Sequence, residues 1–410
     1  MYRSVYLVFL SFALLIACVP GSYKIPGANS VPSPELSLAT SAPTPTLELS
    51  PDDSVPTPVP TLGSETRWLE SESQSSILFE LPSPVIGQDI YWIKPNGEPP
   101  AKLINVSDAI DHAVASPDGK VLAIHTSKPV GIYNESLMLL FIQEGNVLTL
   151  EQNTHISSIV WSPDGKTLVY ARWPRDGYMQ IVGYDVYNSM SRVIADFTSL
   201  GIWYVEGWGQ SDKLLLFHLA GGGKLFDEIA LLDTVGRGME ITYNDPDKML
   251  GHGILAPDGR KVVFSRLLQF GKVDSELYLL DLASREVKLL LPAVTAHGTS
   301  VSVPVWSPDS AYLAVTMGEP DGVKGRQSPL RLVIIKVDTG EISVVTEVKS
   351  PPMLVYPLAW LSDRVLLVNN LGGEKLDMVL YSIHVDGSGM QKISPGRFLT
   401  TLPFISAQSP

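Results

Sequence analysis

The chain has 410 residues, of which 45% are hydrophobic and 18% are charged, a composition typical of a globular protein with a sizeable core. Its formal net charge is −13, and it contains no basic run that could follow a phosphate backbone. These features exclude nucleic acid as the expected partner.

The first 17 residues have the pattern of a signal peptide. Arg3 precedes an uncharged, mostly apolar run over residues 5–17, which suits a signal h-region and is too short to span a bilayer. Cys18 follows directly and is the only cysteine, so no disulfide can form within the chain. Leu15-Ile16-Ala17-Cys18 resembles the lipoprotein box of bacteria. The resemblance implies that Cys18 is lipidated and anchors an extracytoplasmic protein to a membrane; an ordinary signal peptide followed by an incidental cysteine is the alternative.

Residues 18–74 are predicted to form a disordered tether. Ten prolines lie between residues 19 and 73 among many serines and threonines, without apolar periodicity. Such a segment buries too little apolar surface to offset the entropy of ordering. At about 3.1 Å per residue, an extended proline-rich chain of this length reaches at most on the order of 150 Å. We therefore expect a spacer between a membrane and a folded domain.

One motif returns along the remaining chain. In Val160–Ala171 an apolar segment leads into Ser162-Pro163-Asp164-Gly165 and a second apolar segment follows, as expected for a β-hairpin with a tight turn. Similar copies surround Asp118, Asp258 and Asp309, and copies without the proline surround Asp212 and Asp363. The six aspartates are 46, 48, 46, 51 and 54 residues apart, a period that indicates a repeat protein.

A second type of hairpin alternates with the first, with turns such as Asn96-Gly97, Asp338–Glu341 and Asp386–Gly389. Four strands per repeat are typical of a propeller blade. Six full units start near residues 109, 154, 202, 250, 299 and 354. Strands at 77–81, 90–93 and 101–106, joined by a C-terminal strand within 401–407, would complete a seventh and leave no open sheet edge. We predict an all-β, seven-bladed propeller over residues 75–410.

The Trp161-Ser162-Pro163-Asp164-Gly165-Lys166 copies resemble the WD-repeat-like propellers typified by the TolB family. The resemblance covers residues 75–410 and implies the fold. Related blades occur in periplasmic partner-binding proteins, in prolyl peptidases and in some pectin-fragment lyases. The chain lacks the small α/β domain that precedes the propeller of TolB, so the partners of TolB are not carried over. It also lacks the Gly-x-Ser-x-Gly motif of the peptidases, which excludes that activity.

Antiparallel connections alternate between the two ends of a blade. The Ser-Pro-Asp-Gly and Asp/Gly turns should share one end, and the longer blade-to-blade and mid-blade loops the other. The residues that we expect at this second end, as a binding face, are His112, His155, Trp203, Tyr204, His252, His297, Arg326 and Tyr356. The alternatives are unrelated surface residues, or a metal site built from the histidines. We assign no catalytic residue, metal or cofactor.

The sequence therefore favours a lipid-anchored, extracytoplasmic propeller that binds a protein, peptide or glycan at the cell envelope, because rigid scaffolds present function on loops. One alternative is a metal-assisted polysaccharide lyase or hydrolase that uses the histidines. A purely structural envelope protein is another.

Overall fold

A computed structural model describes residues 75–82, 87–93, 99–128, 134–175, 177–197, 202–219, 226–235, 238–245, 249–267, 275–292, 300–318, 330–348, 354–371 and 378–403. The chain divides into residues 1–61 and 62–410, and the second unit contains every described residue. The signal peptide, Cys18, the tether, His297 and Arg326 lie outside the described residues, so the expectations for them remain predictions. In the part that is described, no helix is long and apolar enough to cross a membrane.

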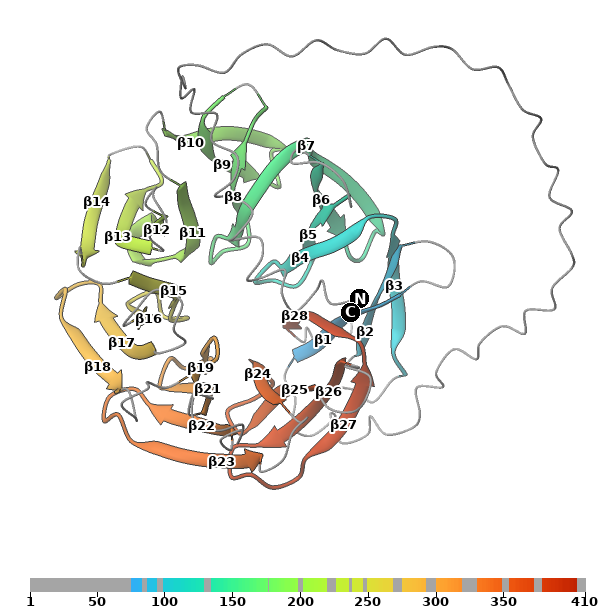
Figure 1. The fold of residues 1–410 in the computed structure, drawn as a ribbon. Helices are drawn as coiled ribbons and strands as arrows, with labels where there is room; N and C mark the ends of the chain where they lie inside the picture. Colours follow the sequence, from blue (N-terminus) through green and yellow to red (C-terminus); the bar gives the residue numbers. More distant parts are fainter. Residues whose placement is uncertain are drawn as a thin grey trace, which may run out of the picture. The chain divides into compact units, whose positions relative to one another are not determined.

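The fold is an all-β propeller, as predicted (Figure 1). Blade 1 comprises β4 (Ala109–Ala115), β5 (Val121–Ser127), β6 (Glu135–Phe141) and the first half of β7 (Asn146–Trp161). Blade 2 comprises the second half of β7, β8 (Thr167–Trp173), β9 (Met179–Asp185) and β10 (Met190–Phe197). Blade 3 comprises β11 (Ile202–Trp208), β12 (Lys213–Leu219), β13 (Phe226–Asp233) and β14 (Met239–Asn244).

Blade 4 comprises β15 (Met249–Leu255), β16 (Lys261–Leu267), β17 (Ser275–Asp281) and β18 (Val287–Leu291). Blade 5 comprises the short strands β19 (Ser300–Val301) and β20 (Val305–Trp306), followed by β21 (Tyr312–Gly318), β22 (Leu330–Lys336) and β23 (Ile342–Val348). Blade 6 comprises β24 (Leu354–Trp360), β25 (Val365–Leu371), β26 (Met378–His384) and β27 (Gln391–Pro395). Blade 7 comprises β28 (Arg397–Pro403), β1 (Ser75–Pro82), β2 (Gln88–Ile93) and β3 (Ala101–Val106).

Hydrogen-bonded pairing joins the described strands into five sheets, because two pairs of blades are continuous. The 16-residue strand β7 runs from blade 1 into blade 2. Phe226 of β13 pairs with Leu250 of β15 and so joins blades 3 and 4. Two of the five sheets therefore contain two blades each, and the other three contain one each. The total is seven blades, in agreement with the repeat spacing.

The two ends of the propeller chain meet in blade 7. β28 pairs with β1, with Leu402 opposite Ser76 and Phe398 opposite Phe79, so the C-terminal strand closes the ring. The sequence placed this closing strand within 401–407. In the structure it begins earlier, at Arg397, and the residues after 403 lie outside the described part. The earlier start adds Phe398 and Leu399 to the strand, and both pack in core clusters of blade 7.

The repeated turn satisfies its own polar groups. In the second copy, Asp164 Oδ1 accepts hydrogen bonds from Ser162 Oγ at 2.7 Å and from the Lys166 N–H at 3.1 Å. Ser162 Oγ accepts from the Thr167 N–H at 2.9 Å. Gly165 has φ +70°, a conformation that favours glycine, and its N–H donates to the Ser162 carbonyl. The carboxylate of the turn aspartate is therefore hydrogen-bonded within its own turn.

In blades 2, 5 and 6, the tryptophan that precedes the turn joins the blade to the one before it. Trp161 Nε1 donates to the Val114 carbonyl, and Trp306 and Trp360 make the equivalent bonds to the previous blade, each at 3.1 Å. All three indoles are only 7% exposed, so their burial adds apolar packing between blades. This contact explains why the motif carries an indole at this position.

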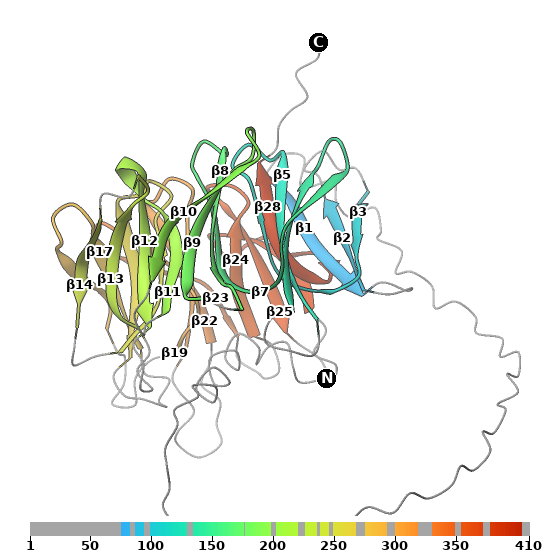
Figure 2. The same ribbon diagram turned by 90° about the horizontal axis from the view of Figure 1, so that it is seen from above.

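We call the end of the propeller with these turns the turn end and the opposite end the loop end. Because neighbouring strands are antiparallel, each first strand runs from the loop end to the turn end. Figure 2 shows β11 ending at the short helix η3 (Gln210–Asp212), which takes the place of the turn in blade 3. First strands of neighbouring blades contact one another, as β4 does with β28 and β7, and form the inner ring in Figure 1.

Candidate binding site at the loop end

The sequence assigned seven of the candidate residues to loops between blades, and this placement is wrong for those that the structure describes. Six of them lie within first strands: His112, His155, Trp203, Tyr204, His252 and Tyr356. His155 is near the loop end of its strand, whereas His112 and His252 occupy the middle of β4 and β15. The first strands start close to the expected unit starts, but their opening residues pair as strand and do not form links between blades.

Strand register places three of these residues at equivalent positions. His112, Tyr204 and Tyr356 each lie opposite the fifth residue of the second strand of their blade. Ser158 takes the same position in blade 2. β-Bulges at different points of the first strands produce this alignment, so residue spacing alone does not reveal it.

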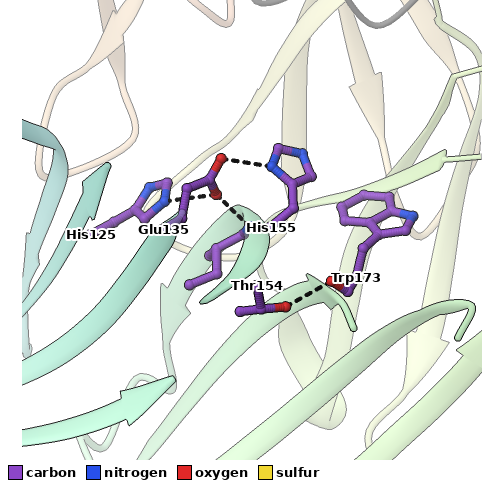
Figure 3. Close-up of polar contacts among 6 residues, drawn as sticks. His125, Glu135, Thr154, His155 and Trp173 are labelled. Carbon is purple, nitrogen blue, oxygen red and sulfur yellow. Dashed lines mark hydrogen bonds and ion pairs between the residues drawn. The ribbon is translucent and has the colours of Figure 1, made fainter. Parts of the chain in front are cut away.

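One polar cluster of the candidate region joins blades 1 and 2 around Glu135, the first residue of β6 (Figure 3). Glu135 Oε2 lies 3.1 Å from His125 Nε2, and Glu135 Oε1 lies 2.8 Å from His155 Nδ1. The Ile156 N–H donates to Glu135 Oε2 at 2.6 Å. One carboxylate of blade 1 thus binds both a side chain and the backbone of blade 2. We call His125, Glu135 and His155 the clasp.

The clasp favours the ionised carboxylate. Burial alone would raise the pKa of Glu135, because a charge is costly to desolvate. The hydrogen bonds and positive potential of His125 and His155 outweigh this effect and lower the pKa to about 2. Glu135 therefore carries a negative charge at neutral pH, held inside the seam between the blades.

His112 lies opposite His125 and belongs to the same region. Its surface is accessible to solvent, but the surrounding protein still removes much of its hydration. This desolvation, with repulsion from His125 and Arg397, lowers the pKa of His112 to about 4. At neutral pH His112 is thus an uncharged imidazole that can both donate and accept a hydrogen bond.

The clasp supports an aromatic loop between β8 and β9. His155 packs against Trp173, with ring centroids 5.2 Å apart, and Thr154 Oγ1 donates to the Trp173 carbonyl at 2.7 Å (Figure 3). Arg175 is exposed and Tyr178 is 60% exposed. We call residues 173–178 the 173–178 loop; Asp176 within it lies outside the described residues.

This loop packs closely on itself and on blade 2. A Cβ atom added at Gly177 would lie 2.9 Å from Pro174 Cγ, closer than real side chains approach. Trp173, at the start of the loop, packs with the apolar cluster between blades 2 and 3. The exposed side chains are therefore carried by anchored backbone, which reduces the entropy lost on binding.

Trp203, by contrast, is part of the core. It is 6% exposed and its ring packs against Phe197 and His218, with centroids 6.0 and 4.5 Å away. The backbone N–H of Trp203 donates to Met179 Sδ at 3.3 Å. Trp203 thus joins blades 2 and 3 and offers little surface to a ligand.

The two tyrosines are also partly enclosed. Burial, assisted by the charge of Glu206, raises the pKa of Tyr204 to about 12. Burial likewise raises the pKa of Tyr356. Both phenols therefore stay protonated at physiological pH.

Metal binding by the histidines finds no support in the residues that can be described. Among them, no three His, Cys, Asp or Glu side chains are arranged to hold a metal ion. In the clasp, His125 and His155 each direct a ring nitrogen at Glu135, which occupies both carboxylate oxygens. The described residues do not fit a metal centre, and we derive no chemistry from one.

The sequence interpretation missed His125, Glu135 and the exposed pair Arg175 and Tyr178. His125 and Glu135 flank the mid-blade loop of blade 1, and strand alternation puts both on the face toward blade 2. This alternation was a usable signal for the pair. Their contact with His155 of the next blade was not predictable from it.

No protein family profile and no curated relative matches the chain. Solved structures do. An oligogalacturonate lyase in complex with manganese is 17% identical, with a TM-score of 0.54 over 82% of this chain and 87% of that one. The β-propeller domain of the Trilobed protease from Pyrococcus furiosus is 12% identical, with a TM-score of 0.54 over 79% and 95%. TolB from Acinetobacter baumannii is 15% identical, with a TM-score of 0.43 over 80% and 81%. At these identities the likeness concerns the fold: the chain is a β-propeller similar to those of known lyases and proteases, and TolB is among the structures that it matches.

Proposed function

We propose that the protein is a lipid-anchored, extracytoplasmic propeller that binds a protein, peptide or glycan of the cell envelope at its loop end. The observation that supports this most is the 173–178 loop, in which an exposed guanidinium and an exposed phenol follow a partly buried indole on anchored backbone. Trp, Tyr and Arg are the side chains that most often dominate binding energy at interfaces.

The difference between the two ends supports the choice of face. At the turn end, the carboxylates of Asp118, Asp164 and Asp309 are engaged by their own serine hydroxyls and backbone N–H groups. At the loop end, Arg175 and Tyr178 are exposed beside the half-buried His155. A ligand gains more from these side chains, because binding does not break an existing turn.

The anchor and the location rest on the sequence. The signal-like run, the Leu15–Cys18 box and the proline-rich tether together describe a protein exported and held near a membrane. Fatty chains on Cys18 would supply the membrane affinity, and the tether the distance.

The experiment uses the full-length protein in detergent with two sets of probes: an array of bacterial and plant oligosaccharides, and a displayed random peptide library. Selected probes are then titrated against Tyr178→Ala, Arg175→Ala and the matched control Tyr187→Ala. Tyr187 is 63% exposed in the turn between β9 and β10, at the other end of the same blade. We expect at least tenfold weaker binding for the first two variants and no change for the control. Binding that is lost only in Tyr187→Ala contradicts the proposed face.

An enzyme is the second candidate, since the fold is similar to that of an oligogalacturonate lyase. This reading requires chemistry from residues beyond those described, because the described residues provide no metal site. Two measurements distinguish an enzyme from a binding module. They are metal analysis of the purified protein and an assay for chain cleavage of the selected oligosaccharides. Cleavage that disappears with a chelator supports the enzyme, and binding without cleavage supports the module.

A further inference from the structure

Two buried polar atoms lie in the seam between blades 7 and 1. Glu80 Oε2 of β1 and Thr126 Oγ1 of β5 have no hydrogen-bond partner among the residues that the structure describes. The Glu80 side chain is 7% exposed and Thr126 is 0% exposed. Native proteins rarely leave such atoms unpaired, and a bound water molecule is a frequent reason.

Strand alternation turns both side chains toward the same seam. Leu78 and Ile124, two residues before Glu80 and Thr126, pack together in the core cluster between blades 7 and 1. Residues two apart on a strand share a face, so Glu80 faces blade 1 and Thr126 faces blade 7. Glu80 lies opposite Arg397, the first residue of β28, which puts it at the loop end.

Thr126 lies at the same end, opposite Ile110, the second residue of β4. Ile110 is also the residue that Gln88 and Arg397 of blade 7 reach across the seam. Gln88 Oε1 accepts from the Ile110 N–H at 2.6 Å, and Arg397 donates to the Ile110 carbonyl. The two unpaired atoms therefore lie on either side of a seam that is already tied by hydrogen bonds.

The two carboxylate oxygens of Glu80 differ in their hydrogen bonds, and only Oε1 has donors among the described residues. Glu80 Oε1 accepts hydrogen bonds from Arg397 Nε and, at 3.3 Å, from Gln88 Nε2. Both donors are themselves fixed on Ile110. The carboxylate is thus oriented by Oε1, and Oε2 remains directed into the buried seam.

We propose that this seam binds one water molecule, which donates a hydrogen bond to Glu80 Oε2 and shares another with Thr126 Oγ1. A water matches the chemistry, since it can donate to a carboxylate while donating to or accepting from a hydroxyl. A metal cation does not, because the Arg397 guanidinium already supplies the positive charge beside Glu80. The water adds a hydrogen-bonded link between blade 1 and β1, the strand with which the closing strand β28 pairs.

Thr126→Val tests the proposal, since it removes the hydroxyl and keeps the shape. Removal of a hydroxyl with no partner leaves the melting temperature unchanged or raises it, whereas loss of a hydroxyl bonded to a fixed water lowers it. Thr316→Val is the matched control, because Thr316 is a buried threonine whose hydroxyl donates to the Val355 carbonyl in the seam between blades 5 and 6. We expect both variants to melt several degrees below the wild type. A lowered melting temperature in Thr316→Val alone overturns the proposal.

A crystal structure of the full chain provides the direct measurement. We expect a water oxygen within about 2.7–3.2 Å of both Glu80 Oε2 and Thr126 Oγ1. If Thr126→Val does not fold, Thr126→Ser retains the hydroxyl and should retain this water. Electron density that shows a direct bond between Thr126 and Glu80, or an ion in place of the water, contradicts the proposal.

Discussion

Glu135 and His155 belong to different blades and are joined across the seam at 2.8 Å. The same carboxylate binds the Ile156 N–H, so blade 1 holds two consecutive residues of blade 2. His155 in turn packs on Trp173, where the 173–178 loop begins. A single half-buried carboxylate therefore helps to fix the position of the candidate binding loop.

Replacement of this charge should weaken the seam. Glu135→Gln keeps the size of the side chain but leaves one oxygen acceptor where the carboxylate had two, so at least one donor loses its partner. We expect a loss of about 1–3 kcal/mol in the free energy of unfolding, measured in urea. Glu144→Gln, at an exposed position in the turn between β6 and β7, is the control and should change stability little. Equal losses in the two variants would show that the clasp does not stabilise the protein.

The low pKa of His112 predicts a loss of stability in mild acid. Its pKa is about 4 when folded, below the ordinary value of 6.5, so between these values only the unfolded chain binds the proton. Stability therefore falls as the pH decreases from about 6.5 to 4, and this contribution is constant below 4. His125, Arg397, Glu135 and His155 surround this region and their charges contribute to the total.

His112→Gln isolates the effect, since glutamine does not titrate. We expect the melting temperature of the wild type to fall more steeply than that of the variant between pH 6.5 and 4, measured by circular dichroism. Parallel curves would contradict the assignment. Glu135 acts in a lower range: its pKa falls from 4.5 to about 2, so its contribution is complete above 4.5 and is lost as the pH falls to 2.

Burial of Trp203 predicts a structural rather than a binding phenotype. Trp203→Ala removes an indole that is 6% exposed between blades 2 and 3, and should cost about 3–5 kcal/mol. Tyr178→Ala removes a side chain that is 60% exposed and should change stability by less than about 0.5 kcal/mol. Denaturant unfolding of the two variants distinguishes the roles. A stable Trp203→Ala protein would return this residue to the list of binding candidates.

The pairing of β28 with β1 predicts that the C-terminal strand is needed for stability. Deletion of residues 398–410 removes Leu399 and Leu402, which pack in one core cluster with Leu78 of β1. The loss of this pairing and burial should cost several kcal/mol, a large part of a typical stability of about 5–15 kcal/mol. Deletion of residues 404–410 alone is the control, because it leaves every described strand intact. A truncated protein that melts within a degree or two of the wild type would contradict closure by this strand.

The lipid anchor predicts a clear effect of Cys18→Ser. Serine lacks the thiol of the residue that the resemblance implies is lipidated, so the variant should lack the fatty chains and lose its stable membrane attachment. Membrane fractionation with mass spectrometry of the mature N-terminus measures both changes. A variant that still sediments with membranes at the wild-type mature mass would show that Cys18 is not the anchor.

The sequence alone determined the propeller because each blade is marked by a turn whose hydrogen bonds form between residues close together in the chain. Each Ser-Pro-Asp-Gly turn fixes its own backbone through contacts within six residues, as between Ser162 and Thr167, so the motif is recognisable wherever it occurs. The spacing of the copies then gave the number of blades and the need for a closing strand. The start of that strand at Arg397 was missed, because it lacks the turn that marks the others.

The tertiary structure decided which side chains meet. The clasp joins residues 20 apart in different blades, and the 7–1 seam brings Arg397 to Glu80 over 317 residues. β-Bulges shift the register of the first strands by one residue, and such a shift changes the face on which a side chain lies. Trp203, which the sequence analysis placed in a loop between blades, instead lies in β11, and its ring is buried between blades 2 and 3. His125 and Glu135 become partners of His155 because blade 1 packs against blade 2. Position along a repeat predicts the strand, but only the packing of neighbouring blades determines the contacts of each side chain.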